Sequence, residues 1–307
     1  MDIYLFRRID QSCDYETRLN LRRLNHLCHV DLHEIMFGLV PLSHVLVQQP
    51  KEIAEVALTH GWERLLKYAI SRGFSDWEWG FTQACEHGHD SLAHELITSG
   101  FKHWNKGLAV ACRYGHDSLV HELIKCGADD WNKGLVWACE GGHVLLVHEL
   151  IKRGANNWNG GLAGACRGNH ESLVHELIKR GADNWNIGLI GACHGGHVLL
   201  CQEMIDRGAN HWNAGLIGAC GGGRESIVRM MIDRGADDWN TGLAWACQCD
   251  HGSVVKMMID LGANDWNGGL AGACEGGHVL LCREMIEHGA DECNHCHRPM
   301  EDHLQHV

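Results

Sequence analysis

The sequence has no long apolar run and no large basic cluster. No apolar stretch approaches the roughly 18 to 20 residues of a membrane span, and the start, MDIYLFRRIDQSCDYE, is charged where a signal peptide would be apolar. Lys and Arg occur at most in pairs, and the formal net charge is -13. Nucleic acids and anionic membranes need a basic face. We therefore expect neither as a partner and predict a cytoplasmic protein.

Recognisable enzyme chemistry is also missing from the sequence. No nucleophile–base pair, phosphate-cradling glycine loop or pair of carboxylates recurs in one place, and the many Gly-Gly pairs lie at expected turns between helices. We therefore predict that the chain is not an enzyme and carries no cofactor.

What the sequence has instead is a repeat of fixed length. Tryptophan, cysteine and glycine each return at a step of 27 residues without insertion or deletion. The tryptophans are Trp77, Trp104, Trp131, Trp158, Trp185, Trp212, Trp239 and Trp266. Eight of the 16 cysteines share one position beside an alanine, which favours buried thiols over disulfides. Such a period indicates an elongated array of stacked repeats around one continuous core.

The repeat at residues 131–157, WNKGLVWACEGGHVLLVHELIKRGANN, indicates two short helices. We expect Asn132 to be the N-cap of the first, helix A, because Asn is a preferred capping residue. Leu135, Ala138 and Cys139 follow at helical spacing. A second helix, helix B, follows the Gly-Gly pair and has an apolar stripe formed by Leu146, Val147, Leu150 and Ile151. Neither helix can bury its apolar face alone, so each repeat must pack on its neighbours.

These residues resemble the ankyrin repeat pattern L-x-x-A-A-x-x-G-H-x-x-x-V-x-x-L-L-x-x-G-A. The matching residues of the quoted repeat are Leu135, Ala138, Cys139, Gly142, His143, Val147, Leu150, Ile151, Gly154 and Ala155. Nine 27-residue repeats over residues 50–292 fit the pattern to some degree. The resemblance implies an all-α, ankyrin-like solenoid of stacked helix-turn-helix repeats. Ankyrin repeats usually have about 33 residues, so we expect shortened or absent β-hairpin fingers.

The repeat motif WN-x-GL-x-x-AC-x-x-GH is similar to that of the short ankyrin repeats of large DNA viruses of amoebae. That resemblance implies an adaptor that acts on host proteins in the host cytoplasm. The eight tryptophans are predicted to be a structural staple that locks repeat to repeat, since each can bury on the order of 150 to 250 Å². The alternative is an exposed stripe for binding, which would be an unusually large apolar surface for a soluble protein.

The ankyrin resemblance also implies that helix A lines the concave face, where a protein partner would bind. Its variable positions are the two before Ala-Cys and the two after, and apart from the larger side chains at some of them they are mostly Gly or Ala. This composition predicts a groove of small residues with a few aromatic and Arg anchors. The candidate partner-binding residues are Arg113, Tyr114, Trp137, Glu140, Arg167, His194, Trp245 and Gln248. A second interpretation is that Trp137 and Trp245 merely fill gaps left by nearby glycines.

The predicted function is therefore a non-catalytic protein–protein interaction scaffold, acting as a monomeric array. The alternative function is that of a structural component of a larger assembly such as a virion, which would associate with itself and would need no varied concave face.

Histidine occupies two positions of the repeat. In seven repeats it begins helix B, where the resemblance implies a structural bond between neighbouring repeats. The second position holds His94, His121, His148 and His175, which would be about 8 to 10 Å apart and too distant to share a metal ion. Protonation would add like charges along one face, so we predict some loss of stability in mild acid.

Both termini lie outside the regular period. Residues 1–49 are interpreted as an N-terminal helical cap or a docking segment, and residues 293–307 as a tail or a broken tenth repeat. The tail has the one cluster with metal-like spacing, a candidate zinc site formed by Cys293, Cys296, His303 and His306. Cys293 also lies one period after Trp266, so the start of a tenth repeat explains part of the cluster without zinc.

Overall fold

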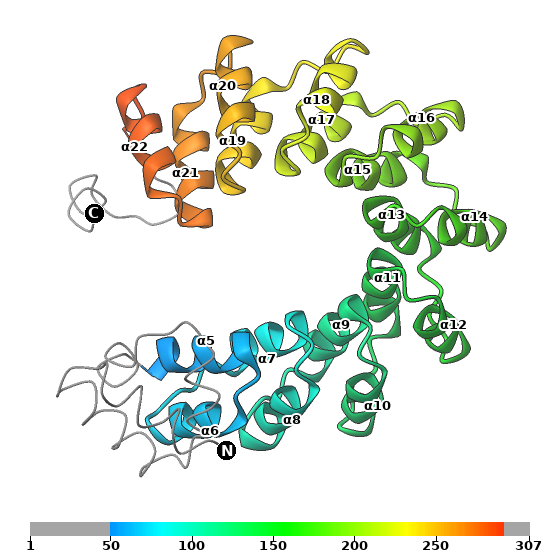
Figure 1. Ribbon diagram of the computed structural model, residues 1–307. Helices are drawn as coiled ribbons and strands as arrows, with labels where there is room; N and C mark the ends of the chain where they lie inside the picture. Colours follow the sequence, from blue (N-terminus) through cyan, green and yellow to red (C-terminus); the bar gives the residue numbers. More distant parts are fainter. Residues whose placement is uncertain (1–49, 292–307) are drawn as a thin grey trace, which may run out of the picture. The chain divides into compact units, whose positions relative to one another are not determined.

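A computed structural model describes residues 50–291, which form paired helices joined by short connections (Figure 1). The chain divides into two compact bodies, with the boundary after Asp130. The described part of the first body contains α5 (Pro50–His60), α6 (Glu63–Ser71), α7 (Trp77–Glu86), α8 (Asp90–Ser99), α9 (Trp104–Tyr114) and α10 (Asp117–Lys125). Residues 50–291 contain no strand, which confirms the all-α class and the solenoid of helix pairs.

The second body continues the same alternation of helix A and helix B. Its helices are α11 (Trp131–Gly141), α12 (Val144–Lys152), α13 (Trp158–Gly168), α14 (Glu171–Lys179), α15 (Trp185–Gly195), α16 (Val198–Asp206), α17 (Trp212–Gly221), α18 (Glu225–Ile232), α19 (Trp239–Gln248), α20 (Gly252–Asp260), α21 (Trp266–Gly276) and α22 (Val279–Glu287). Odd numbers from α7 onward are A helices, and even numbers from α8 onward are B helices.

The expected cap of helix A is wrong by two residues. Helix A begins at the tryptophan, and the residue before it is the N-cap, as in α13, where the Asn157 side chain accepts a hydrogen bond from the Gly160 amide. Asp or Asn caps four other A helices in the same way. The asparagine after the tryptophan lies inside the helix. Its side chain forms hydrogen bonds that bridge to the next repeat.

This bridging asparagine satisfies backbone amides of the connection that follows helix B. The Oδ1 atom of Asn186 accepts hydrogen bonds from the amides of Asn210 and His211, at 2.8 and 3.0 Å. The same pair of bonds is made by Asn105, Asn132, Asn159, Asn213 and Asn240. A typical hydrogen bond of this kind contributes about 0.5 to 1.5 kcal/mol net, so the bridge stabilises a connection too short to satisfy its own amides.

The histidine that begins helix B bonds in the opposite direction, to the preceding repeat. The ring Nε2 of His170 donates to the carbonyl oxygen of Glu140 at 3.0 Å, and that of His197 donates to the carbonyl oxygen of Arg167 at 3.0 Å. These carbonyls lie near the end of helix A, where no intrahelical donor remains. The structural bond that the resemblance implied for this histidine is confirmed.

The core repeats the same small set of buried residues. Helix A contributes Leu, Ala and Cys, as in Leu189, Ala192 and Cys193, which are fully buried. Helix B contributes residues such as Leu200 and Met204. Full burial of one such large apolar side chain stabilises by roughly 1.5 to 3 kcal/mol. Because each repeat supplies a complete set, the core extends through each body.

Glycines let consecutive A helices of the second body pack backbone against backbone. A Cβ atom on Gly164, Gly191, Gly218 or Gly272 would collide with a carbonyl oxygen of the preceding A helix. These glycines are buried. The predicted groove of small residues is therefore wrong for this position of the repeat, because the neighbouring helix already covers it.

The repeated tryptophans are half-buried, and four of them lie against the end of helix B in their own repeat. The guanidinium of Arg153 lies 5.6 Å from the ring centroid of Trp131, and Arg180 and Arg207 make the same contact with Trp158 and Trp185. In the last described repeat, His288 stacks on Trp266 at 4.7 Å. These contacts join helix A to helix B within a repeat. The staple between repeats stays a prediction.

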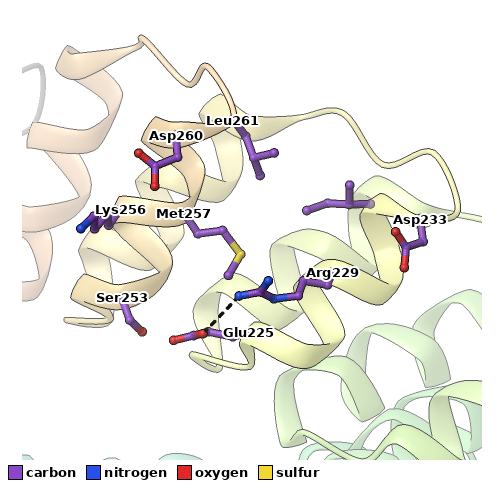
Figure 2. A pocket seen from close by; sticks show the side chains of 9 residues that line it. Glu225, Arg229, Asp233, Ser253, Lys256, Met257, Asp260 and Leu261 are labelled. Atoms are coloured by element: carbon purple, nitrogen blue, oxygen red, sulfur yellow. Dashed lines mark ion pairs between the residues drawn. The ribbon is translucent and has the colours of Figure 1, made fainter.

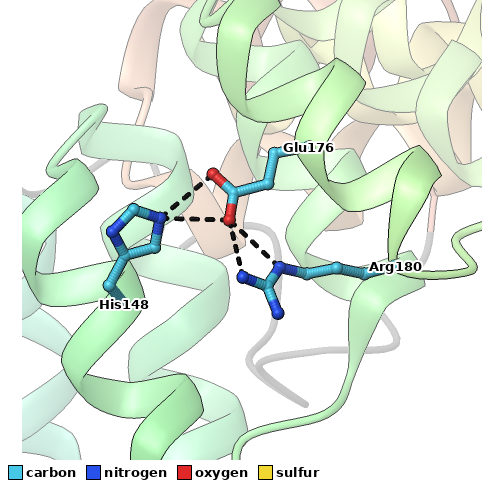
Figure 3. Close-up of polar contacts among 3 residues, drawn as sticks. All are labelled: His148, Glu176 and Arg180. Carbon is cyan, nitrogen blue, oxygen red and sulfur yellow. Dashed lines mark hydrogen bonds and ion pairs between the residues drawn. The ribbon is translucent and has the colours of Figure 1, made fainter.

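Helix B of one repeat is linked to helix B of the next by ionic side chains. His148 Nε2 lies 3.0 Å from Glu176 Oε1, which also accepts hydrogen bonds from Arg180 at 2.9 and 3.0 Å (Figure 3). His175, Glu203 and Arg207 repeat the arrangement one period later. Partial burial alone would raise the pKa of Glu176, but hydrogen bonds and charge from His148 and Arg180 outweigh it and lower the pKa. These carboxylates oppose the histidine repulsion on which the expected acid sensitivity depends.

Candidate functional site

The candidate partner-binding residues fall in both bodies. Arg113 and Tyr114 lie at the end of α9 in the first body, where the guanidinium is 5.7 Å from the phenol ring centroid. The other six are in the second body, at or near the ends of A helices. They are Trp137, Glu140, Arg167, His194, Trp245 and Gln248.

Four of those six belong to one cluster in the second body. Arg167 Nη1 lies 3.5 Å from Glu140 Oε2, and the Glu140 side chain is only 10% exposed whereas that of Arg167 is 37% exposed. Glu140, Arg167 and His194 occupy the same position of the repeat in α11, α13 and α15. The next repeat has Gly221 at this position, which leaves room for a large side chain from α19.

Trp245 covers the space above Gly221. A Cβ atom built on Gly221 would have the Trp245 ring at 3.6 Å and the His194 ring at 3.8 Å, which are ordinary contact distances. Trp245 nevertheless keeps 45% of its surface exposed. It therefore fills part of a gap, as the second interpretation held, and also presents an indole face to solvent. We call Glu140, Arg167, His194, Gly221 and Trp245 the Trp245 cluster.

The position of Trp245 in the repeat explains why it is exposed. In α13, α15, α17 and α21 this position is a glycine pressed against the preceding A helix. An indole cannot enter that space, and α19 packs less closely on α17 than α21 packs on α19. Trp137 occupies the same position in α11 and is half-buried.

The electrostatics of the cluster keep His194 neutral near pH 7. Burial, followed by the positive charges of Arg167, Arg224 and His251, lowers the pKa of His194 to about 4. Arg224 stands where other repeats have the bridging histidine, and its Nε donates to the His194 carbonyl oxygen at 3.3 Å. Burial raises the pKa of the nearby Cys249 thiol, although the charge of Arg167 opposes the shift. With a pKa of about 4 the His194 imidazole is a weak base, and the Cys249 thiol stays protonated near neutral pH.

The backbone of Gln248 takes part in a hydrogen bond between repeats. Its carbonyl oxygen accepts from the ring Nε2 of His278 at 3.0 Å. This bond is the histidine bridge described above, so the structure gives Gln248 a structural role at the end of α19 whether or not a partner contacts it.

A second surface feature, which the sequence analysis missed, lies on the opposite side of the repeats. A groove of about 590 Å³ separates α18 from α20 (Figure 2). It is lined by Glu225, Arg229, Ile232, Asp233, Ser253, Lys256, Met257, Asp260 and Leu261. Arg229 Nη2 forms an ion pair within its own helix, 3.8 Å from Glu225 Oε2, instead of reaching α20.

The sequence does contain a signal for this groove. Counted in periods of 27, Arg229, Met257 and Leu261 occupy the positions of His148, Glu176 and Arg180 three repeats earlier. Replacing the glutamate with methionine removes the acceptor that links consecutive B helices. Aligning the repeats by position shows methionine in place of the glutamate at Met230 and Met257, and the groove lies at the second of these.

Metal binding is not supported by a cluster in the described part of the chain. Between residues 50 and 291, no three His, Cys, Asp or Glu side chains lie together as metal ligands would. The candidate zinc ligands Cys293, Cys296, His303 and His306 lie outside the described residues, as do the predicted cap or docking segment at 1–49 and the tail. The helices of residues 50–291 are too short and too polar to cross a lipid bilayer.

Comparison with known proteins identifies the repeat type. The family model for ankyrin repeats, which covers three copies, matches residues 108–188. A comparison with curated proteins finds no match. The matched residues run from within α9 to within α15 and include the ionic contacts of Figure 3. Ankyrin repeats are therefore present in the chain.

Proposed function

We propose that this array of ankyrin repeats is a non-catalytic scaffold that binds a protein partner at the Trp245 cluster. Ankyrin repeats generally mediate protein–protein interaction and are typically found in non-enzymatic scaffolds. The histidine and asparagine bridges repeat in almost every copy and serve the fold. A binding site is therefore to be sought where a repeat departs from the common pattern, and Trp245 is such a departure.

The exposed indole of Trp245 is the observation that carries the proposal. With 45% of its surface exposed, it is the most exposed tryptophan among residues 50–291. The guanidinium of Arg167 belongs to the same cluster. Trp and Arg are the residue types that most often dominate the binding energy of protein interfaces. An apolar side chain of the partner would lie on the indole, and a carboxylate would approach Arg167.

We further propose that the chain is an adaptor of viral origin that acts on host proteins in the host cytoplasm. This assignment rests on the resemblance of the short Trp-Asn repeats to those of large DNA viruses of amoebae. The alternative is a structural component of a larger assembly such as a virion. The two differ in the partner, because a structural component would associate with copies of itself.

A crosslinking experiment tests the location of the partner. A photoreactive residue placed at position 245 should capture a protein partner from host lysate, whereas the same residue at Lys256, on the helix B side, should not. The captured protein is then purified and titrated against the unmodified chain and Trp245→Ala. We expect the substitution to weaken binding by about 30-fold, which corresponds to about 2 kcal/mol for a central interface tryptophan.

Stability measurements separate binding from folding. Trp245→Ala should bind less tightly while its melting temperature stays close to that of the unmodified chain. If the melting temperature falls and affinity for the captured protein is unchanged, Trp245 only fills the gap above Gly221. If the photoreactive residue at position 245 captures a second copy of the chain, the result would favour the structural component.

A further inference from the structure

Two repeats of the second body contain a second cysteine in contact with the cysteine of helix A. In the repeat of α15 and α16, the Sγ atoms of Cys193 and Cys201 are 3.6 Å apart. In the repeat of α21 and α22, the Sγ atoms of Cys274 and Cys282 are 3.5 Å apart. The pairs are separated by three whole periods and occupy the same two positions. The contact is therefore a property of those positions.

The remaining repeats show which residue occupies the helix B position when it is not cysteine. The helix B position of Cys201 and Cys282 is valine in five other repeats, as in Val147, Val174 and Val228, alanine in one and leucine in the first. Those valines are as buried as Cys201, so packing alone is satisfied without sulfur. Cysteine in place of valine keeps the core filled and adds one chemical capability, because a thiol can bond to the thiol that faces it.

We propose that Cys193 with Cys201 and Cys274 with Cys282 form two reversible disulfides, each tying helix A to helix B of its repeat, when the protein meets hydrogen peroxide. One thiol sulfur attacks the peroxide, the O–O bond breaks, and a sulfenic acid and one water form. The second thiol sulfur attacks the sulfenic sulfur, the S–S bond forms, and a second water leaves. The two thiols lose two protons and two electrons, and the peroxide is reduced to two waters.

The surroundings of the two pairs predict different rates. Cys193 and Cys201 are both fully buried. The hydrogen bond between the two thiols, together with burial, raises the pKa of Cys193, and the same hydrogen bond lowers the pKa of Cys201. Cys201 is therefore the thiol that supplies the reactive thiolate, but full burial keeps peroxide away, so this pair reacts slowly and only when the repeat opens locally. Cys274 is partly exposed. The pair at Cys274 and Cys282 therefore reacts first.

Forming either disulfide requires only a small movement of the two cysteine side chains. A disulfide needs the sulfur atoms at about 2.05 Å, and both side chains can rotate about their Cα–Cβ bonds. Each bridge closes a loop of only a few residues within one repeat, so it constrains the helix pair without linking separate repeats. The closed ring restricts the unfolded chain, and stability should rise.

The test treats the full-length protein with hydrogen peroxide, blocks remaining thiols with an alkylating reagent in denaturant, and maps the peptides by mass spectrometry. The expected result is two crosslinked pairs, Cys274 with Cys282 appearing before Cys193 with Cys201, each lighter by two hydrogen atoms and restored by a thiol reductant. The helix A thiols Cys139, Cys166 and Cys220, whose helix B partner position is valine, should remain alkylated in the same samples. The melting temperature should rise with the fraction crosslinked.

Matched substitutions come from the chain itself. Cys201→Val and Cys282→Val adopt the residue of the other repeats, so each should fold normally and abolish one crosslink. Val147→Cys should add a third crosslink, between Cys139 and the introduced thiol. The proposal is overturned if both thiols of each pair remain alkylatable after other thiols have been oxidised. It is also overturned if they end as sulfinic acids, or if they pair with cysteines outside their own repeat.

Discussion

The same three repeat positions do opposite things in two regions of the second body. Between α12 and α14 they hold His148, Glu176 and Arg180, which bind one another and link the two helices (Figure 3). Between α18 and α20 they hold Arg229, Met257 and Leu261, and a groove of about 590 Å³ is present (Figure 2). The core residues beneath are equivalent in both regions. The inward positions therefore determine the fold, and the outward positions are available to change.

The A helices show the same division of roles. Where their seventh residue is glycine, as in α15, consecutive helices approach backbone to backbone. Where it is Trp245, the helix packs less closely and an indole reaches solvent. Regular and irregular repeats thus differ in few side chains, and the three predictions below alter those side chains.

The largest effect should come from closing the space between two regular A helices. Gly191→Ala puts a Cβ atom against the carbonyl oxygen of Ala163, which is backbone and cannot move aside cheaply. We expect a loss of about 3 kcal/mol in the free energy of unfolding. The matched change Gly221→Ala meets only side-chain atoms at 3.6 Å and beyond, and should be neutral or stabilising by up to about 1 kcal/mol. Urea unfolding of both variants measures the difference, and equal losses would contradict it.

An intermediate effect on stability should appear on acidification, and it should come from His194 of the Trp245 cluster. The unfolded chain binds a proton at this histidine near pH 6.5, whereas the folded protein binds it only near pH 4. The unfolded state therefore holds more protons between these values, and stability falls as the pH falls from about 6.5 to 4.

The pH effect at His194 should amount to on the order of 2 kcal/mol, because the ring is partly exposed and solvent screens the arginines. His194→Gln should lose that part of the pH dependence, measured as unfolding free energy at pH 7 and pH 4.5. An NMR titration of His194 with a midpoint above 6 would show that neither burial nor the arginines lower its pKa.

The smallest effect should come from restoring the ionic link in the groove. Met257→Glu places a carboxylate where Glu176 stands, facing Arg229 instead of His148. The exposed pair should stabilise by about 0.3 to 1 kcal/mol, and Leu261→Arg in addition should complete the trio. Glu176→Met is the reverse control and should lose a similar amount. Thermal unfolding at low and high salt measures both, and a gain that salt does not reduce would point to packing instead of charge.

Much of this molecule could be predicted from its sequence, because the fold depends on contacts within one period. The period of 27, the two helices, the buried Leu, Ala and Cys positions and the histidine bond all follow from local spacing or from the ankyrin resemblance. The asparagine after the tryptophan was misassigned because an Asn near a helix start is usually a cap. Only the spatial position of the next connection shows that Asn186 reaches the amides of Asn210 and His211.

The candidate site could be predicted only in part. Arg167, His194 and Trp245 were named from their residue types, and the structure brings them together. The glycines beside them were assigned to an open groove, because sequence alone does not give the distance between consecutive A helices. The groove at Met257 and the thiol pair at Cys193 were missed for a related reason. Each depends on which residue of the next helix faces a given position.

The bridging bonds have a consequence for how such a chain can change its length. Each bridging asparagine reaches forward to the next repeat, and each bridging histidine reaches back to the preceding one. A block of 27 residues duplicated or deleted in the gene would thus join its new neighbours through the same bonds as before. A shift of a single residue would break both bridges at once. Recombination between whole copies is therefore the step by which such an array can grow without first losing its fold.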